Sequence, residues 1–247
     1  MPGLDWLIAR PIAHRGLHDA AHGVIENTPS AIAAAIAGDY GIEVDLQITA
    51  DGEAMVYHDD ALGRLTEGKG HLAEMSAAEL KRIPFLATAD RMITLGELCD
   101  LVRGRATLVI ELKSRFDGDR RLAERAARVL QNYAGPVAVM SFDPALVAAL
   151  YELAPGLPRG IVAQKRYDSS EWKDLSDIQG RMRHLIRAMC TRPHFVAYAI
   201  RDLPAAAPLF ARYIFGLPLL TWTVRNADDR LRAERWADQM IFEGFRA

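Results

Sequence analysis

Cysteine is scarce in this chain, with only Cys99 and Cys190 among 247 residues. The two are not in CxxC spacing, which argues against a disulfide framework or a zinc site. Both lie in helix-patterned sequence, so we expect two buried thiols. Such cysteine usage fits a reducing compartment, and we predict a cytoplasmic location.

Long apolar runs and an excess of one charge are also missing. No stretch approaches the roughly 18 consecutive apolar residues of a membrane span. The start, MPGLDWLIARPIAHRG, lacks the basic and then apolar regions of a secretion signal, so we expect no transmembrane segment and no export. The net charge of -2 and pI of about 6.4 argue against nucleic-acid binding through the phosphate backbone. Any phosphate recognition must be local, and the sequence does not define the oligomeric state.

Apolar strand-like runs alternate with helix-patterned segments over most of the length, which is typical of βα units around a parallel sheet. The expected strands lie at residues 7–14, 41–47, 106–113, 136–141, 158–164, 194–200, 218–224 and 238–243. Eight strands in a chain of this size predict a TIM-type (β/α)₈ barrel forming one catalytic domain over residues 1–247. An open doubly wound sheet is the alternative.

Two places depart from a regular barrel. Residues 59–93 contain a Gly-rich turn and a short amphipathic helix where a plain loop should follow the second strand, and we interpret them as a small insertion subdomain. The chain ends just after the last expected strand, so a full eighth helix is missing and the C-terminal end is shortened.

The stretch EVDLQITADGEAMVYHDD places Glu43 and Asp45 two residues apart in a strand. Their side chains therefore point to one face, with Cα atoms about 6 to 7 Å apart. Two ionised carboxylates at that separation repel each other, and a hard cation such as Mg²⁺ or Ca²⁺ would remove the repulsion. The alternative is that one carboxylate pairs with a basic side chain while the other is solvated.

The strand ATLVIELKS repeats this geometry with Glu111 and Lys113. At the carboxyl end of a barrel strand, Glu111 would add a third oxygen ligand and Lys113 could bind an anionic substrate group. Alone, the two residues would be interpreted as an ion pair.

Two histidines are expected at strand ends. His14 closes the first strand in IAHRG, and His58 follows EAMVY. Imidazoles titrate near neutral pH and suit a general acid and base, while Arg15 offers a planar fork for phosphate oxygens. Asp59 and Asp60 could orient His58. The remaining histidines are expected to be surface or satisfied groups: His18, His22, His71, His184 and His194.

An ordered set of motifs resembles the glycerophosphodiester phosphodiesterases, a family of PI-PLC-like phosphodiesterase TIM barrels. The motifs are HRG, ENTPSA, EVDLQITADGEAMVYHD, LGRLTEGKG, ITLGEL, IELK and TWTV. The resemblance covers most of the chain and is densest before residue 113.

The resemblance implies metal-dependent hydrolysis of a glycerophosphodiester to sn-glycerol 3-phosphate and an alcohol. By position, it implies acid/base histidines at His14 and His58, ligands of one divalent cation at Glu43, Asp45 and Glu111, and substrate contacts from Arg15, Lys113 and Trp222. Glu26 and Asn27 match residues that line and support the same site. An ordinary barrel aromatic is the alternative for Trp222.

Three places differ from the family. The chain ends in IFEGFRA, where many members have an aspartate and a proline, so Glu243 stands in the place of the aspartate. Arg225 separates TWTV from the asparagine that usually follows directly. Residues 165–193 match no motif of the family. Alternative functions are a related phosphodiesterase acting on lysophospholipids, in the manner of a lysophospholipase D, and a non-catalytic barrel that binds phosphorylated ligands.

Overall fold

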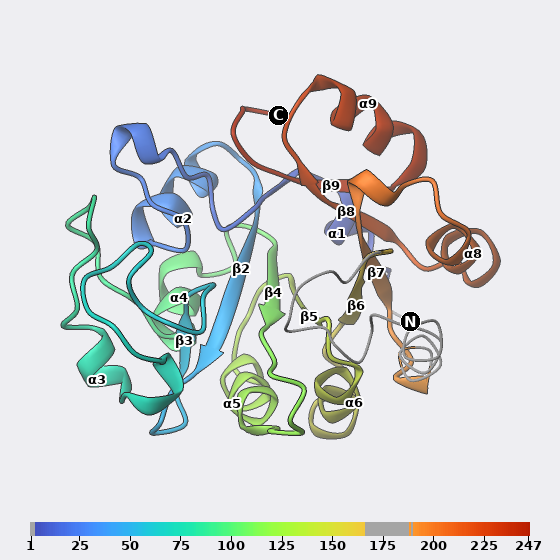
Figure 1. Ribbon diagram of the computed structural model, residues 1–247. Coiled ribbons are helices and arrows are strands. Elements are labelled where there is room, and N and C mark those ends of the chain that lie inside the picture. Colours follow the sequence, from blue (N-terminus) through green and yellow to red (C-terminus); the bar gives the residue numbers. More distant parts are fainter. Residues whose placement is uncertain (1–2, 166–187, 189) are drawn as a thin grey trace.

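Within residues 3–165, 188 and 190–247, which the computed structural model describes, eight parallel strands close into a barrel (Figure 1). The strands are β1 (Ile12–Ala13), β2 (Gly41–Ile48), β4 (Leu108–Leu112), β5 (Val137–Ser141), β6 (Arg159–Ala163), β7 (Phe195–Ala199), β8 (Leu219–Val224) and β9 (Gln239–Phe242). Closure comes from β1, which pairs with both β9 and β2. The prediction of a (β/α)₈ barrel is therefore confirmed, and the open sheet is excluded.

The strands are apolar throughout because both of their faces are buried. In β4, Leu108 and Ile110 point outward and pack beneath the helices, in the larger hydrophobic cluster. Val109 points inward and joins Phe195 and Ile241 in a second cluster that fills the barrel. Parallel strands covered on both sides typically have such unbroken apolar runs.

The first strand is shorter than predicted, because residues Asp5–Ile8 form a helix, α1. Leu7 of this helix is fully buried in the barrel-filling cluster, with Trp6 and Ile8 packed against it. The apolar residues before Pro11 thus pack under the barrel rather than pair in the sheet. An apolar run of this length indicates burial but does not distinguish the two.

Seven further helices surround the barrel or lie in its loops, and Figure 1 shows α5 and α6 side by side on its outer face. Within the described ranges they are α2 (Pro29–Ala37), α3 (Ala77–Leu80), α4 (Leu95–Val102), α5 (Arg121–Leu130), α6 (Pro144–Leu153), α8 (Ala206–Phe215) and α9 (Ala227–Trp236). Thr94 caps α4 through a reciprocal capping box with Glu97, and Asp143 caps α6. Most of the segment 165–193, including His184, lies outside the described residues.

A ninth strand, β3 (Ala54–Val56), pairs antiparallel with β2. Gly52 adopts a φ of 78° in the turn between the two strands, a conformation that glycine reaches without a steric cost. The chain then passes through the 3₁₀ turn η2 (Leu72–Glu74) and α3, on the opposite side of the barrel from α8 in Figure 1. A separate hydrophobic cluster that includes Tyr57 and Met92 lies here. The division of residues 1–247 into one domain with an insertion at 59–93 remains a prediction.

After β9, residues 243–247 form no helix. Cys99 is half-buried, and burial raises the pKa of its thiol to about 11. Cys190 is exposed, so the prediction of a buried thiol there is wrong. Its neighbours Ala188 and Thr191 face inward instead. No helix of the described residues is long and apolar enough to cross a membrane.

Candidate active site

Three carboxylates from neighbouring strands meet at the carboxyl end of the barrel. Asp45 on β2 and Glu111 on β4 are register partners, and Glu43 precedes Asp45 by two residues on the same face. One oxygen from each of the three lies within 4.8 Å of the others, and all three side chains are buried. Carboxylate oxygens are ligands for hard cations, so this cluster could hold a metal ion.

The carboxylates of this cluster differ in pKa. Burial, followed by the charges of Asp45 and Glu111, raises the pKa of Glu43 well above its ordinary value. Burial opposes ionisation of Asp45 as well, but the neighbouring Lys113, His58 and Arg15 side chains outweigh it and lower the pKa of Asp45. The donors therefore fit a divalent cation, since added positive charge would relieve the repulsion that Glu43 experiences.

Lys113 lies against the carboxylates that it was expected to accompany. Its Nζ is 2.8 Å from Asp45 Oδ1 and 2.6 Å from Glu111 Oε1. These two carboxylates raise the pKa of Lys113 despite its burial. The ion pair weighed as the alternative for the IELK motif is therefore present, and the same ammonium also borders the acidic cluster.

Arg15 follows His14 at the end of β1 and faces the same cluster. Its backbone N–H donates to Glu43 Oε2 at 3.0 Å, and its Nε lies 3.2 Å from Asp45 Oδ2. Its Nη1 donates to Glu26 Oε1 at 2.6 Å. A Cβ on the next residue, Gly16, would come within 2.8 Å of the Ala31 backbone, so only glycine allows this close turn.

Asn27 fixes the orientation of Asp45. Its side-chain amide donates to Asp45 Oδ2 at 2.9 Å, and its carbonyl oxygen accepts from the Asp45 backbone N–H at 3.2 Å. Asn27 is buried and has a φ of 59°, a conformation more accessible to asparagine than to most residues. Within the ENT motif, Glu26 thus pairs with Arg15, and Asn27 forms hydrogen bonds with Asp45.

His14 contacts Phe242 and Glu243, which lie far from it in the sequence. Its backbone N–H donates to Phe242 O at 2.9 Å, and its Nδ1 lies 2.5 Å from Glu243 Oε2. Its Nε2 lies 3.9 Å from Glu43 Oε2. Burial lowers the pKa of His14, although the Glu243 carboxylate opposes the change.

His58 reaches the site through the β2–β3 hairpin. Tyr57 N–H donates to Asp45 O at 3.0 Å and the Gln47 amide donates to His58 O at 2.8 Å, so the hairpin ties His58 to β2. His58 Nδ1 lies 2.7 Å from Asp59 Oδ1. Asp60 lies against His71 instead, at 3.2 Å, so only the first of the two expected aspartates contacts His58.

Two cavities meet at this cluster, and both are lined by His58, Glu111 and Lys113. One, of about 400 Å³, also includes His14 and Trp222. The Trp222 ring packs edge-on against Phe142 with centroids 5.5 Å apart, so Trp222 is both a barrel aromatic and a cavity wall.

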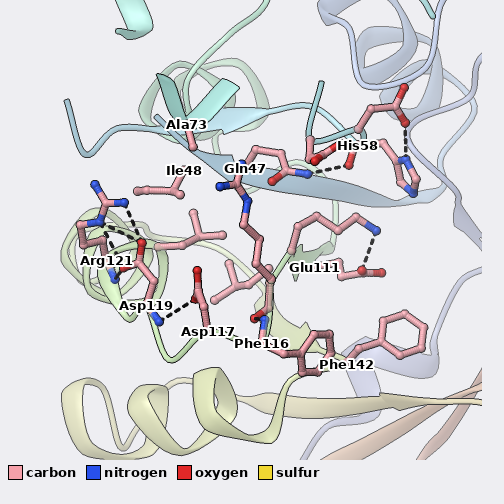
Figure 2. Close-up of a pocket in the computed structure, with 17 residues that line it drawn as sticks. Gln47, Ile48, His58, Ala73, Glu111, Phe116, Asp117, Asp119, Arg121 and Phe142 are labelled. Carbon is pink, nitrogen blue, oxygen red and sulfur yellow. Dashed lines mark hydrogen bonds and ion pairs between the residues drawn. The ribbon is translucent and has the colours of Figure 1, made fainter. Parts of the chain in front are cut away.

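The second cavity, of about 580 Å³, extends along the loop after β4. Figure 2 shows His58 and Glu111 toward one end of it and Asp119 and Arg121 toward the other. Its lining is rich in charged side chains. It lies directly beside one of the two histidines and the acidic cluster.

Several residues around the site were not singled out from the sequence. Arg64 contacts both Asp59 and Glu26, and its only signal was its place in the LGRLTEGKG motif. His18 was expected to be a surface or satisfied group, yet its Nε2 lies 3.7 Å from Glu243 Oε2, and its side chain is only 20% exposed. The contacts of Arg64 with Glu26 and of His18 with Glu243 join segments that are far apart in the sequence, so no local sequence pattern predicts them.

The fold and the site together define a TIM-barrel protein with a candidate metal centre, two histidines and two cations at the carboxyl ends of its strands. The chain belongs to the Glycerophosphoryl diester phosphodiesterase family, whose sequence profile matches residues 14–245. The expected family is therefore confirmed.

Curated relatives match over part of their length. A glycerophosphodiester phosphodiesterase of Caldanaerobacter subterraneus is 31% identical over 163 residues, which is 62% of this chain and 66% of the relative. Glycerophosphodiester phosphodiesterase 1 of Mus musculus is 31% identical over 43% of this chain and 34% of its own. The matched segments thus span about two thirds and one third of these proteins.

Solved structures match more completely. A phosphodiesterase of Oleispira antarctica, in complex with the product sn-glycerol-3-phosphate, has a TM-score of 0.74 at 21% identity and covers 94% of this chain and 91% of its own. A glycerophosphodiester phosphodiesterase of Thermotoga maritima has a TM-score of 0.70 at 22% identity, covering 94% and 92%. At these identities the likeness shows the fold alone.

Proposed function

We propose that the protein hydrolyses glycerophosphodiesters to sn-glycerol 3-phosphate and an alcohol, and that the reaction depends on one divalent cation, Mg²⁺ or Ca²⁺. The observation that carries the proposal is the convergence of Glu43, Asp45 and Glu111 with two histidines beside a shared pair of cavities. Membership of the family and the product named for the Oleispira antarctica neighbour support the substrate class.

The acidic cluster would hold the cation, which when bound supplies positive charge to a phosphate oxygen. Arg15 and Lys113 lie at the rim of this cluster and would bind the remaining phosphate oxygens. Trp222 would form a wall of the substrate pocket. Glu26 and Asn27 would hold Arg15 and Asp45 in position.

His14 and His58 would move the protons. One takes a proton from the nucleophile, and the other donates a proton to the departing alkoxide. The nucleophile is either water or the substrate's own neighbouring hydroxyl, which would give a cyclic phosphate first. Detection of that cyclic product at early times separates the two routes.

The charged lining of the larger cavity favours a polar alcohol over an acyl chain. Asp59, Asp117 and Asp119 line it together with Arg115 and Arg121, and an acyl chain there would desolvate these charges at a cost. We also propose a cytoplasmic location, which the two free cysteines support.

The test uses protein stripped of metal with EDTA and assayed with glycerophosphocholine and lysophosphatidylcholine side by side. We expect glycerol 3-phosphate and choline from the first substrate only after Mg²⁺, Ca²⁺ or Mn²⁺ is added. Hydrolysis of the lysolipid alone would move the activity to the lysophospholipase D type. Tight ligand binding by calorimetry without product under any divalent metal would indicate a binding protein.

A further inference from the structure

The two histidines of the site share one arrangement, in which the ring contacts a carboxylate and the carboxylate accepts from an arginine. His14 Nδ1 lies 2.5 Å from Glu243 Oε2, and Arg225 Nε donates to Glu243 Oε1 at 2.6 Å. His58 Nδ1 lies 2.7 Å from Asp59 Oδ1, while Arg64 Nε donates to Asp59 Oδ2 at 2.6 Å. The arginines come from unrelated segments, one after β8 and one after β3 (Figure 1).

Each carboxylate is an acceptor in this arrangement. Burial alone would raise the pKa of Glu243, but its contacts with His14, His18 and Arg225 lower that pKa below the usual range. The pKa of Asp59 is also lowered, because His58 and Arg64 outweigh the effect of burial. An ionised carboxylate can only accept, so Nδ1 of each imidazole donates and Nε2 is left for proton transfer.

We propose that Arg64 and Arg225 are positioning residues, each of which fixes the ring of one histidine by holding its carboxylate partner. The inference rests on the proposed hydrolase function. Neither arginine needs to touch the substrate in this role, because the guanidinium acts on the carboxylate and the carboxylate acts on the ring. Arg64 donates to both oxygens of Asp59, and Arg225 donates to the oxygen of Glu243 that His14 does not contact, so each carboxylate has little freedom to rotate.

The two arginines differ in what else they hold. Arg64 Nη2 also donates to Glu26 Oε1 at 2.7 Å, and the same oxygen accepts from Arg15 Nη1 at 2.6 Å. Arg64 therefore links His58 to the arginine that is proposed to bind phosphate. The side chain of Arg225 donates to Glu243 alone within the described part of the chain, so it acts on His14 only.

Arg225 and Glu243 stand at two of the places where we expect the sequence to differ from the family that it resembles. Glutamate is one methylene longer than aspartate and has one more rotatable bond, so its carboxylate is less restrained. Arg225 removes that freedom by occupying the second oxygen. The two departures are thus explained together as one pair that keeps His14 in place.

The experiment measures kcat and KM for glycerophosphocholine in the metal-loaded wild-type enzyme and in Arg225→Met, Arg225→Lys, Arg64→Met and Arg64→Lys. We expect Arg225→Met to lower kcat about tenfold with KM within about twofold, because only the histidine is affected. Arg64→Met should lower kcat about tenfold and also raise KM about threefold through Arg15.

The lysine variants provide a second readout. Lysine offers one compact charge and lacks the planar fork with which Arg64 reaches Asp59 through Nε and Glu26 through Nη2. Arg225→Lys should therefore recover most of kcat, whereas Arg64→Lys should recover little. Arg230→Met is the matched control, since Arg230 is also exposed and, among the described residues, pairs only with Glu234 on α9 at 3.1 Å; its kinetics should be unchanged.

Each outcome decides one question. Wild-type protein that releases no product with any divalent metal contradicts the proposed function, whatever the variants do. An active wild-type enzyme with unchanged kcat in Arg225→Met and Arg64→Met overturns the positioning roles. A rise in KM alone for Arg225→Met would mean direct substrate contact instead. If circular dichroism shows that a methionine variant is unfolded, the contrast between the two lysine variants decides.

Discussion

Asp45 on β2 and Glu111 on β4 lie opposite each other in the barrel, and the ammonium of Lys113 bridges them at 2.8 Å and 2.6 Å. Two buried anions on adjacent strands are stabilised by a cation that joins them. The same two residues contribute oxygens to the candidate metal site. Lys113 thus contributes to the stability of a cluster whose function would require a second, divalent cation.

Replacement of Lys113 by methionine should reveal this contribution. In metal-free protein the variant leaves two buried carboxylates without their shared partner, and we expect the free energy of unfolding to fall by about 3 kcal/mol. Added Mg²⁺ or Ca²⁺ should recover much of the loss. Urea denaturation with EDTA and with each metal measures both effects. Lys81→Met, which removes a surface pair with Glu97, should change stability by less than about 1 kcal/mol. Equal losses in both variants would contradict the bridging role.

Binding of a divalent cation should release protons. Burial and two neighbouring carboxylates raise the pKa of Glu43 above its ordinary 4.5 in the metal-free fold. A group with a raised folded pKa favours the native state fully below its unfolded pKa, and this contribution is lost as pH rises through the folded pKa. In metal-free protein the contribution of Glu43 to stability should therefore fall as pH rises from about 4.5 through the raised pKa of Glu43. Metal-loaded protein should show no such loss. Calorimetric titration of metal in two buffers of different ionisation enthalpy gives the number of protons released. The same enthalpy in both buffers would disprove the linkage.

Alanine at either histidine should lower kcat by roughly two to four orders of magnitude, if each moves a proton in the reaction. His22→Ala is a suitable control, because His22 is 79% exposed and pairs only with Asp19. Steady-state kinetics with glycerophosphocholine, together with thermal melting to verify folding, measure the effect. Near-wild-type turnover in both His14→Ala and His58→Ala would reject the acid/base roles.

The site should also make the fold sensitive to acid. The pKa of Glu243 is lowered from its ordinary 4.5, because contacts with His14, His18 and Arg225 outweigh burial. A depressed pKa contributes stability above the unfolded value and loses it as pH falls through the folded value. Glu243→Gln should therefore show a smaller loss of unfolding free energy between about pH 6 and pH 3 than the wild type does. Denaturant titrations at several pH values test this, with Glu234→Gln on exposed α9 as the control. An identical acid-side slope in Glu243→Gln would refute it.

Much of this architecture could be predicted because it depends on short-range regularities. Glu43 and Asp45 share a face because alternate residues of a strand do so, and parallel strands place their carboxyl ends, and hence Glu111, at the same edge. Asp51-Gly52, a pair typical of tight turns, lies at the bend that brings His58 back to β2. Seven of the eight predicted strands lie where their apolar runs are.

The rest depends on packing that a linear pattern does not specify. Residues 5–8 are apolar enough for a strand, but they fill the lower end of the barrel as a helix. Arg64 contacts Glu26 across 38 positions, so its role could not be read from its own neighbours. Cys190 faces outward because the inward positions beside it belong to Ala188 and Thr191.

The contact between His14 and Glu243 joins residues 229 positions apart. During synthesis His14 leaves the ribosome well before its carboxylate partner, Glu243, is added to the chain. A nascent chain can therefore form β2, β4 and the acidic cluster long before His14 is oriented. A fragment ending just before Glu243 would keep all three candidate metal ligands, Glu43, Asp45 and Glu111, yet lack the carboxylate that contacts His14, so the orientation of that ring would be set only once Glu243 is in place.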